Sequence, residues 1–372
     1  MSNKANSGRK PKPVLKIAID AGSISASPAQ RGGIARICRT LVKHLPRLDR
    51  RNKYLIYLFN KIDLDLPESS KERVMLRVLP RLGFGRLFLP LALMLDRPDV
   101  FLAVSQFFPA ASPTTLGFVY DLAFLSPKFQ TSKTTSLKYN TEILVNQAKH
   151  LVTTSESSKK AILKKYRLDQ YKISVVTPGV DPLFLSSGAK ILSDKPYFLY
   201  VGALKPYKNV PMILKAFYTF LKNTNSGFRL IIAGEIEGDN EIKKTLKQLS
   251  LEKYVTLTGF INDTELVKYY RGAFAFVSPA LIEGFGFPLL EAMACGIPVI
   301  AGNNSAMKEV VGKAGLLVDA ESITEIAAAM KKLATDMTYY NKLSRLGRKY
   351  TGKFNEQKFA KEVLNIINKK ML

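Results

Sequence analysis

Several residue types are scarce in this chain of 372 residues, which contains no tryptophan, two cysteines and two histidines. Cys38 and Cys295 lie far apart and belong to no CxxC or Cys/His cluster. This spacing argues against a disulfide framework or a structural zinc site and fits a reducing cytosol. His44 and His150 are too few for a histidine-rich catalytic metal site. We therefore expect a cytoplasmic protein without a bound metal.

Long apolar runs are also missing. The most apolar stretch, Leu87 to Leu95, is nine residues long and is interrupted by Pro90, whereas a helix that crosses a bilayer needs about 20 residues. The chain opens with MSNKANSGRKPKP, which is polar and basic and precedes no signal-type apolar run. This opening predicts a solvated arm over residues 1–13. The sequence indicates a protein that is soluble or peripheral to a membrane.

Acidic residues are few, at 30 against 56 lysines and arginines, so the net charge is +26. The excess is concentrated in residues 1–180, which hold 30 basic and 12 acidic side chains. The N-terminal half is therefore expected to contact an acidic membrane face, a phosphate-bearing acceptor or nucleic acid, unless the charge serves solubility alone. Because no RNP, KH or zinc-finger pattern is present, we expect no specific nucleic-acid binding.

Short apolar runs alternate with helical segments in two series along the chain. The expected strands are Val14–Asp20, Tyr54–Phe59, Val74–Leu79, Asp99–Val104, Leu116–Tyr120, Leu151–Thr154 and Ile173–Thr177, then Tyr197–Val201, Arg229–Ala233, Val255–Leu257, Phe274–Ser278, Pro298–Ala301 and Gly315–Val318. Such alternation predicts an α/β fold with parallel sheets covered on both faces. The length exceeds what one core usually serves, so we expect two Rossmann-like domains facing each other across a ligand-binding cleft.

The domain boundaries follow from breaks in this alternation. Two prolines and a glycine interrupt residues 177–184, and SSGAK at 186–190 has the composition of a linker. We expect an N-terminal domain over residues 14–185 and a C-terminal domain over residues 190–352. The last segment, residues 353–372, is expected to be a helix that packs back toward the N-terminal domain. Asn209 and Asp263 are the expected N-caps of two helices in the C-terminal domain.

The most informative segment is SPALIEGFGFPLLEAMACGIP, residues 278–298. Pro288 suits the first turn of a helix, because its missing N–H has no partner there. Gly284 and Gly286, in the loop before this helix, allow the backbone to approach a ligand closely. We expect unpaired N–H groups around Leu289 and Leu290 to bind an anion such as a diphosphate.

Two carboxylates accompany this predicted anion site. Because acids beside a phosphate would repel it, Glu283 and Glu291 are expected to face neutral hydroxyl groups. Glu291, placed in the first turn of the helix, suits a ribose diol, and Glu283, on the loop, suits the hydroxyls of a sugar. The alternative is that Glu291 complements the helix dipole and Glu283 belongs to a turn.

Glu283 and Glu291, with seven residues between them, resemble the EX7E signature of retaining GT-B glycosyltransferases of family 4, and EGFGFPLLEAMACGIPVIA is close to the pattern of that family. Further pieces agree in order, namely Gly32–Arg36, Val152–Lys159, Ile173–Asp181, Val201–Asn209 and Ser305–Val310. The resemblance covers residues 15 to 320. It implies a GT-B fold in which the N-terminal domain binds the acceptor and the C-terminal domain binds a nucleotide-sugar donor. It also implies retention of configuration at the anomeric carbon, without a required metal or other cofactor.

The resemblance also implies roles for individual residues. Lys208 resembles the lysine that touches the donor diphosphate, where a cation offsets charge on the leaving group. Gly33, at the start of the first N-terminal helix, is expected to present N–H groups to the phosphates from across the cleft. The implied donor site comprises Gly33, Gly202, Lys205, Lys208, Glu283, Gly284, Phe285, Gly286, Leu289, Leu290 and Glu291.

Two positions depart from the family pattern. Many relatives carry arginine where this chain has Ala203, so either Lys205 supplies that charge or Lys208 acts alone. The pair His-Asp is replaced here by Tyr120-Asp121, and a tyrosine hydrogen-bonds a sugar hydroxyl but does not serve as an imidazole does near neutral pH. We place Tyr120, Asp121 and Arg36 on the acceptor side.

We expect Glu283, Lys208 and Asp121 to be the catalytic residues. Asp121 is the candidate in the N-terminal domain for the carboxylate nucleophile that a covalent route requires. The resemblance instead favours a front-face route, in which the departing phosphate helps to deprotonate the acceptor. The segment Val201–Asn209 resembles mannosyltransferases of polysaccharide assembly, so GDP-mannose is the first expected donor and UDP-hexose the second.

The acceptor is expected to be a glycan or lipid-linked glycan of the cell envelope. Arg73, Arg77, Arg81 and Arg86 are interleaved with apolar residues. This pattern suits an acidic bilayer surface, or else an ordinary strand and helix whose apolar side is core. Alternative functions are a nucleotide-sugar epimerase, a phosphorylase with lysine-bound pyridoxal phosphate, a nucleic-acid-binding protein, and a catalytically inactive nucleotide-sugar-binding subunit.

Overall fold

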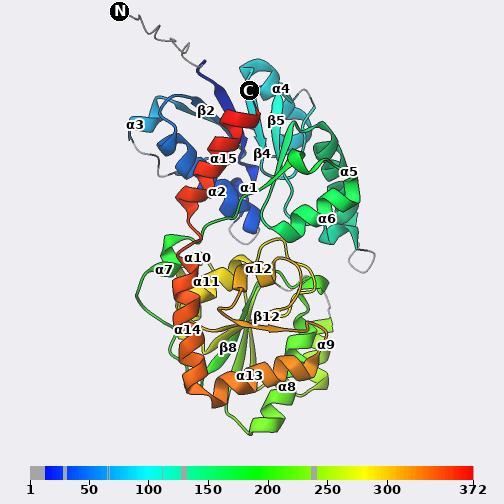
Figure 1. The fold of residues 1–372 in the computed structure, drawn as a ribbon, viewed down its shortest axis with the longest axis vertical. Helices are drawn as coiled ribbons and strands as arrows, with labels where there is room; N and C mark the ends of the chain where they lie inside the picture. Colours follow the sequence, from blue (N-terminus) through cyan, green and yellow to red (C-terminus); the bar gives the residue numbers. More distant parts are fainter. Residues whose placement is uncertain are drawn as a thin grey trace, which may run out of the picture.

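The structure, a computed structural model, describes residues 13–371 except 28–31, 65, 67, 111, 127–131 and 236–240. The predicted arm over residues 1–13 therefore lies outside the described residues, apart from Pro13. Two parallel sheets with helices on their faces occupy the two halves of the molecule, the N-terminal half above and the C-terminal half below in Figure 1. This arrangement confirms the predicted α/β architecture of two Rossmann-like domains.

The N-terminal sheet has seven strands in the order β3-β2-β1-β4-β5-β6-β7, and all neighbours are parallel. Ile19 in β1 lies between Ile56 of β2 and Leu102 of β4. The inner strands are apolar along their length because helices cover both faces of the sheet. The strands are β1 Lys16–Asp20, β2 Lys53–Leu58, β3 Val74–Val78, β4 Val100–Ala103, β5 Thr114–Phe118, β6 His150–Thr153 and β7 Ile173–Val175.

The helices of this half are α1 Gly22–Ser25, α2 Gly33–Leu48, α3 Glu68–Lys71, α4 Leu89–Asp96, α5 Ser132–Gln147 and α6 Glu156–Tyr166. A π-helical turn, Phe84–Phe88, leads into α4. The short helix α7, Pro182–Leu185, follows in the passage to the second half. Gly33 begins α2 as the sequence predicted.

The C-terminal sheet has six parallel strands in the order β10-β9-β8-β11-β12-β13. They are β8 Tyr197–Val201, β9 Arg229–Ala233, β10 Val255–Gly259, β11 Ala275–Ser278, β12 Val299–Gly302 and β13 Leu316–Val318. The helices are α8 Val210–Thr224, α9 Glu241–Gln248, α10 Asp263–Gly272, α11 Phe287–Ala294, α12 Met307–Val311, α13 Ile323–Thr335 and α14 Met337–Thr351. The N-cap of α10 is Asn262, which accepts a 3.0 Å hydrogen bond from the amide of Glu265, so the prediction that Asp263 caps this helix was wrong.

The final helix, α15 (Glu356–Lys370), returns to the N-terminal half and lies beside α2 in Figure 1. Its apolar side joins the core formed by β1 and α2, through Phe359, Ala360, Val363 and Ile367. Glu356 accepts a 2.9 Å hydrogen bond from Thr40. The last helix therefore stabilises the N-terminal domain, although it follows the C-terminal domain in the sequence.

The chain passes between the halves at two adjacent points. Val180 pairs with Asn355 in a parallel β-bridge, and the amide of Val180 donates to the carbonyl of Phe354. Gly179 has no room for a side chain, because a Cβ there would lie 2.1 Å from the nitrogen of Glu356. The two segments that connect the domains are thus hydrogen-bonded to each other at the domain boundary.

Candidate functional site

The loop that follows β8 positions Lys208. Gly202 follows the strand with φ of 150°, and a 3₁₀ turn, Pro206–Lys208, ends at Asn209 in the left-handed region, with φ of 62°. Asn209 precedes α8 but its side chain does not cap the helix, which corrects the predicted capping role. Instead, its Nδ2 donates to the carbonyls of Pro279 at 3.0 Å and Ala320 at 2.7 Å. These bonds fix the loop to the carboxyl edge of the sheet.

A second loop, between β11 and α11, positions Glu283. The amide of Leu281 donates to the carbonyl of Tyr207 at 2.8 Å, which ties the two loops together. The amide of Glu283 donates to Ser305 Oγ at 3.2 Å. The carboxylate of Glu283 forms an ion pair and hydrogen bond with the ammonium of Lys208. Two predicted catalytic residues are therefore in direct contact.

Burial lowers the pKa of Lys208, but the charge and hydrogen bond of Glu283, together with Tyr200 and Tyr207, outweigh burial and leave the pKa above its usual value. Lys208 is consequently a cation at neutral pH. Its side chain is 17% exposed and that of Glu283 is 18% exposed, so both groups are reachable from the surface while being largely shielded from water. A cation in such a place attracts an anion strongly, because the local dielectric constant is lower than that of bulk water.

The N-terminal domain contributes Asp121 to the same place. A Cβ on Gly284 would lie 2.8 Å from the carbonyl oxygen of Tyr120 and 3.1 Å from Asp121 Oδ2. Thr154 Oγ1 donates to the carbonyl of Gly284 at 3.0 Å. Burial raises the pKa of Asp121, the amide of Ala123 opposes this rise, and Glu283 adds to it. The loop of Gly284 and Gly286, here called the glycine loop, thus lies directly against the N-terminal domain.

Tyr120 does not face the cleft, contrary to its predicted place on the acceptor side. Its hydroxyl donates a 2.6 Å hydrogen bond to the carbonyl of Val104, and the ring belongs to the core of the N-terminal domain. The side chain is 9% exposed. The position of this hydroxyl is set by packing around β4, so a sugar cannot reach it without disrupting that core.

The start of α11 also differs from the prediction. The helix begins at Phe287 after Gly286, whose φ is 102°, and Pro288 occupies its first turn as expected. The amides of Leu289 and Leu290 both donate to the carbonyl of Gly286, at 3.1 and 3.2 Å. They are not the unpaired N–H groups that the sequence suggested, because the turn at Gly286 brings its own carbonyl under them.

Gly33 faces this helix start across the domain boundary. A Cβ on Gly33 would lie 3.1 Å from Cδ2 of Phe287. The first turns of α2 and α11 are therefore neighbours, as the prediction of a phosphate site shared by both domains requires. Phe285 is buried behind them, and Lys205 is exposed at the start of the 3₁₀ turn.

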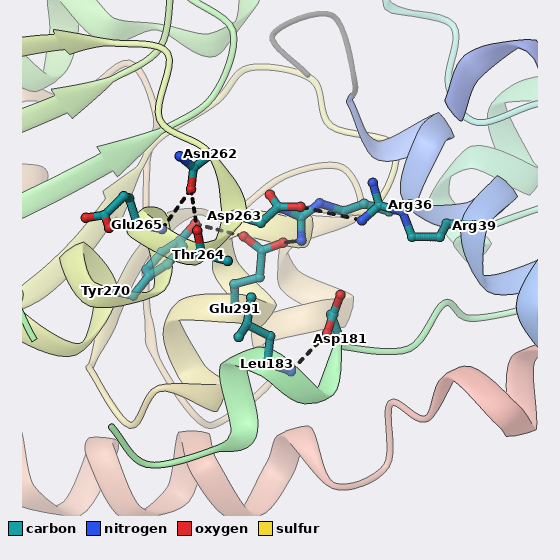
Figure 2. A network of polar contacts seen from close by, with 10 residues as sticks. All are labelled: Arg36, Arg39, Asp181, Leu183, Asn262, Asp263, Thr264, Glu265, Tyr270 and Glu291. Carbon is teal, nitrogen blue, oxygen red and sulfur yellow. Dashed lines mark hydrogen bonds and ion pairs between the residues drawn. The ribbon is translucent and has the colours of Figure 1, made fainter. Parts of the chain in front are cut away.

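Glu291 lies in the second turn of α11 rather than the first, and Figure 2 shows its carboxylate enclosed by polar side chains. It forms an ion pair with Arg36, accepts a 3.0 Å hydrogen bond from the hydroxyl of Tyr270, and is 2% exposed. Burial raises its pKa, whereas Arg36 and Tyr270 oppose that rise. The carboxylate of Glu291, which was predicted to bind a ribose, is thus engaged by protein groups in this structure.

Arg36 was predicted on the acceptor side but reaches into the C-terminal domain. Its guanidinium also lies 3.4 Å from Asp263, which is 3.5 Å from Arg39 (Figure 2). Sequence reasoning missed Asp263 and Tyr270 as neighbours of Glu291. Their spacing of seven residues on one helix, which places both on the same side of α10, was the available signal.

Among the cavities that the described residues form, two lie at the domain boundary. The one beside Arg36 and Glu291 has a volume of about 10 Å³, roughly the space of one water molecule. A nucleotide can therefore reach Glu291 only if Arg36 or a whole domain moves. The larger cavity, about 280 Å³, lies on the side of Phe285 and is also lined by Glu309, Lys353 and Asn355.

Within the described ranges, no group of three or more His, Cys, Asp or Glu side chains is arranged to hold a metal ion. The charged groups at the domain boundary form ion pairs instead, between Lys208 and Glu283 and between Arg36 and the carboxylates of Glu291 and Asp263.

Residues 186–350 match the family described as "Glycosyl transferases group 1". Among curated relatives, O-antigen chain mannosyltransferase B of Escherichia coli is 26% identical over 59% of this chain and 61% of its own length. O-antigen chain mannosyltransferase RfbU of Salmonella typhimurium is 31% identical over 51% of this chain and 52% of its own. The matched part of the chain thus spans about half of the length of these relatives.

Solved structures match nearly the whole chain. Sucrose-phosphate synthase from Thermosynechococcus elongatus has a TM-score of 0.74 at 19% identity, over 95% of this chain and 98% of its own. HepE from Anabaena, in complex with UDP and glucose, has a TM-score of 0.71 at 18% identity, over 95% and 99%. At these identities the likeness concerns the fold, and it confirms the predicted GT-B arrangement.

Proposed function

We propose that the protein is a retaining, metal-independent glycosyltransferase, because residues 186–350 match the group 1 glycosyltransferase family and the chain has a GT-B fold. It transfers a hexose from a nucleotide-diphosphate sugar to a glycan or lipid-linked acceptor of the cell envelope. The observation that carries this proposal is the contact between Lys208 and Glu283, where the C-terminal sheet faces Asp121 of the other domain.

The pair of Lys208 and Glu283 is suited to a substrate that carries both an anion and hydroxyl groups. A diphosphate entering beside Lys208 competes for its ammonium, because the phosphate oxygens carry more negative charge than one carboxylate. Glu283 is then released to accept hydrogen bonds from the sugar hydroxyls. During transfer, Lys208 stabilises the charge that develops on the leaving diphosphate, a form of catalysis that acts strongly where water is excluded.

Glu291 is proposed to bind the ribose of the donor, and the ribose hydroxyls then take the place that the guanidinium of Arg36 has in this structure. Once displaced from Glu291, Arg36 keeps its charge near the start of α11, beside the expected position of the diphosphate. Arg36 thereby compensates for the arginine that relatives carry at the position of Ala203. Lys205, exposed on the same loop, is the second source of positive charge.

For the chemical step we favour the front-face route. The bond between the anomeric carbon and the phosphate oxygen breaks, the acceptor oxygen attacks from the same face, and its proton passes to the departing phosphate. Asp121 remains the candidate nucleophile of the alternative covalent route.

The donor and the acceptor class rest on the relatives. Two of them are named O-antigen chain mannosyltransferases, which supports GDP-mannose as the first donor and an envelope polysaccharide as the product. HepE, with the same fold, was crystallised with UDP and glucose, which supports a UDP-hexose as the second.

Calorimetric titration with GDP, GDP-mannose, UDP and UDP-glucose, all in the presence of EDTA, tests this function. We expect nucleotides of one base to bind without metal, and Glu291→Gln to bind them at least tenfold more weakly, since it loses charged hydrogen bonds to the ribose. Glu265→Gln, an exposed change on α10, is the matched control. Absence of binding by all four nucleotides would contradict the proposal.

An assay of sugar transfer with and without an acceptor distinguishes the proposed transferase from an epimerase and from an inactive subunit. An epimerase converts the bound nucleotide sugar without an acceptor, and an inactive subunit binds the donor but transfers nothing to a lipid-linked envelope glycan preparation. Our proposal requires acceptor-dependent release of the nucleoside diphosphate, with a product whose anomeric configuration, read by NMR coupling constants, equals that of the donor.

A further inference from the structure

The helix α4, with sequence LPLALMLD, is apolar on all of its sides but is packed on one. Leu89, Ala92 and Leu93 belong to a core cluster with residues of β1, β2 and β4. The opposite side carries Leu91, Met94 and Leu95, which are 46%, 58% and 83% exposed. A helix that is apolar all round is normally buried all round. The described part of the chain places no partner on this side, so a partner from outside is expected.

The exposed side continues beyond α4. Leu87, in the preceding π-helical turn, is 52% exposed, and Leu82 in the loop before it is 92% exposed. Leu87, Leu91, Met94 and Leu95 are spaced by four, three and one residues, so they follow one stripe along the continuous helical segment. We call Leu82, Leu87, Leu91, Met94 and Leu95 the outer α4 face.

Basic residues accompany this face along the sequence. Arg81, Arg86 and Arg97 are exposed in the same segment. Asp96 is the one acidic residue between positions 74 and 97, and it is engaged by Arg77 at 2.5 Å and by the hydroxyl of Tyr57 at 3.0 Å. The three other arginines therefore give the rim of the outer α4 face a net positive charge.

The exposed apolar side chains and the nearby arginines together indicate which partner binds the outer α4 face. A second copy of the chain would bring the same arginines together, in a protein whose net charge is +26, and like charges at an interface oppose association. An acidic bilayer surface offers anionic headgroups to the arginines and a shallow apolar layer to the leucines. We propose that the outer α4 face docks on the surface of an anionic lipid bilayer.

The segment that carries the outer α4 face connects the cleft edge of the N-terminal sheet with the far end of that half. Phe84, at the start of the π-helical turn, lies against Phe59 with ring centroids 5.5 Å apart, and a Cβ on Gly22 would be 2.9 Å from its ring. Gly22 follows the carboxyl end of β1, the end that faces the domain boundary. The segment therefore begins at the cleft edge of the N-terminal sheet, and α4 lies toward the end of the N-terminal half that is remote from the C-terminal half (Figure 1).

The absence of tryptophan from the chain provides a direct test that does not depend on glycosyl transfer. In the variant Leu95→Trp, the single indole reports on this face alone. Adding vesicles of phosphatidylglycerol and phosphatidylethanolamine is expected to shift its emission to the blue, and brominated lipids are expected to quench it. The control Leu192→Trp places the indole at a site of similar exposure, 84%, in the other domain, and its emission is expected to stay unchanged.

Flotation of the unaltered chain with lipid vesicles measures how strongly it associates with the bilayer. We expect association with the anionic vesicles to exceed that with phosphatidylcholine vesicles and to weaken as salt rises. The triple variant Leu91→Gln, Met94→Gln, Leu95→Gln is expected to partition at least tenfold more weakly, because it removes the inserted apolar groups. Its melting temperature should stay near that of the parent chain, since the three side chains face outward. The pair Leu192→Gln and Met337→Gln is the matched control.

Two results would overturn the proposal. One is that vesicle binding is the same in the triple variant as in its control and the emission of Leu95→Trp does not change. The other is that the chain dimerises through this face, with the triple variant monomeric and vesicle binding absent, which would make the outer α4 face a protein interface. The variant Arg81→Ala, Arg86→Ala, Arg97→Ala leaves the apolar groups intact and should still lose the preference for anionic lipid.

Discussion

Replacing Lys208 with methionine is expected to lower kcat/KM for sugar transfer by about a thousand-fold. The ammonium of Lys208 is the cation in contact with Glu283 at the carboxyl edge of the C-terminal sheet. Removing one such group that stabilises charge in a transition state costs about a hundred- to a thousand-fold in rate, and weaker donor binding adds to this. Release of nucleoside diphosphate under saturating acceptor measures the effect.

The same change also has a structural consequence that must be separated from catalysis. Without Lys208, the largely buried carboxylate of Glu283 loses its partner, and the free energy of unfolding is expected to fall by about 1–3 kcal/mol. The double variant Lys208→Met, Glu283→Gln removes both charges and should recover most of that loss, but no activity. Lys268→Met, which breaks the exposed ion pair of Lys268 with Glu265, is the matched control. Activity of Lys208→Met within tenfold of the parent would refute the assigned role.

Replacing Gly284 with alanine is expected to lower transfer by about a hundred-fold or more while the C-terminal domain stays folded. The added methyl group would lie 2.8 Å from the carbonyl oxygen of Tyr120, a distance that real Cβ atoms essentially never adopt, and 3.1 Å from Asp121 Oδ2, which is a tight contact. Because the first of these contacts is backbone, the N-terminal domain must shift away. Displacement of catalytic groups by about 1 Å can cost a hundred-fold in rate.

The effect of Gly284→Ala should fall on transfer much more than on binding of the nucleoside diphosphate, since Lys208 and Glu291 belong to the C-terminal domain. Gly32→Ala is the control, because a Cβ there meets nothing within 4 Å. Parallel measurement of kcat and of the dissociation constant for the nucleoside diphosphate distinguishes the two effects. If Gly284→Ala transferred sugar at the rate of Gly32→Ala, the contact between the glycine loop and the other domain would have no part in catalysis.

Much of this site is predictable from the sequence, because strand order dictates where loops end. Lys208 follows β8 and Glu283 follows β11, and neighbouring parallel strands bring their carboxyl ends to one edge. Gly33 at the start of α2 and Pro288 in the first turn of α11 follow from local rules of helix initiation. These features need no knowledge of how the two domains face each other.

The remaining features depend on tertiary contacts that the sequence does not reveal. Tyr120 points into the core because Val104 offers its carbonyl there. The amides of Leu289 and Leu290 are engaged because Gly286 adopts a positive φ. The contact of Arg36 with Glu291 exists only because the domains approach each other at this place. Similarly, the outer side of α4 has the same composition as its buried side, so periodicity alone does not distinguish them.

The structure also explains why a charge pattern is a weak guide to a binding site. Arg73 and Arg77 belong to the basic and apolar segment noted in the sequence, yet Arg73 donates to the carbonyls of Asp49 and Pro46 and Arg77 is paired with Asp96. Both serve the N-terminal domain itself. Arg81 and Arg86, which are exposed, are the members of that set available to an anionic partner.

The central claim is that one diphosphate sugar binds to Lys208, Glu283 and Glu291 at the domain boundary. A crystal structure of the chain with GDP or with UDP tests it most directly. We expect the diphosphate within hydrogen-bonding distance of the Lys208 ammonium, the ribose hydroxyls on Glu291, and Arg36 displaced from that carboxylate. A nucleotide bound elsewhere, with the ion pairs of Lys208 with Glu283 and of Arg36 with Glu291 both intact, would contradict it.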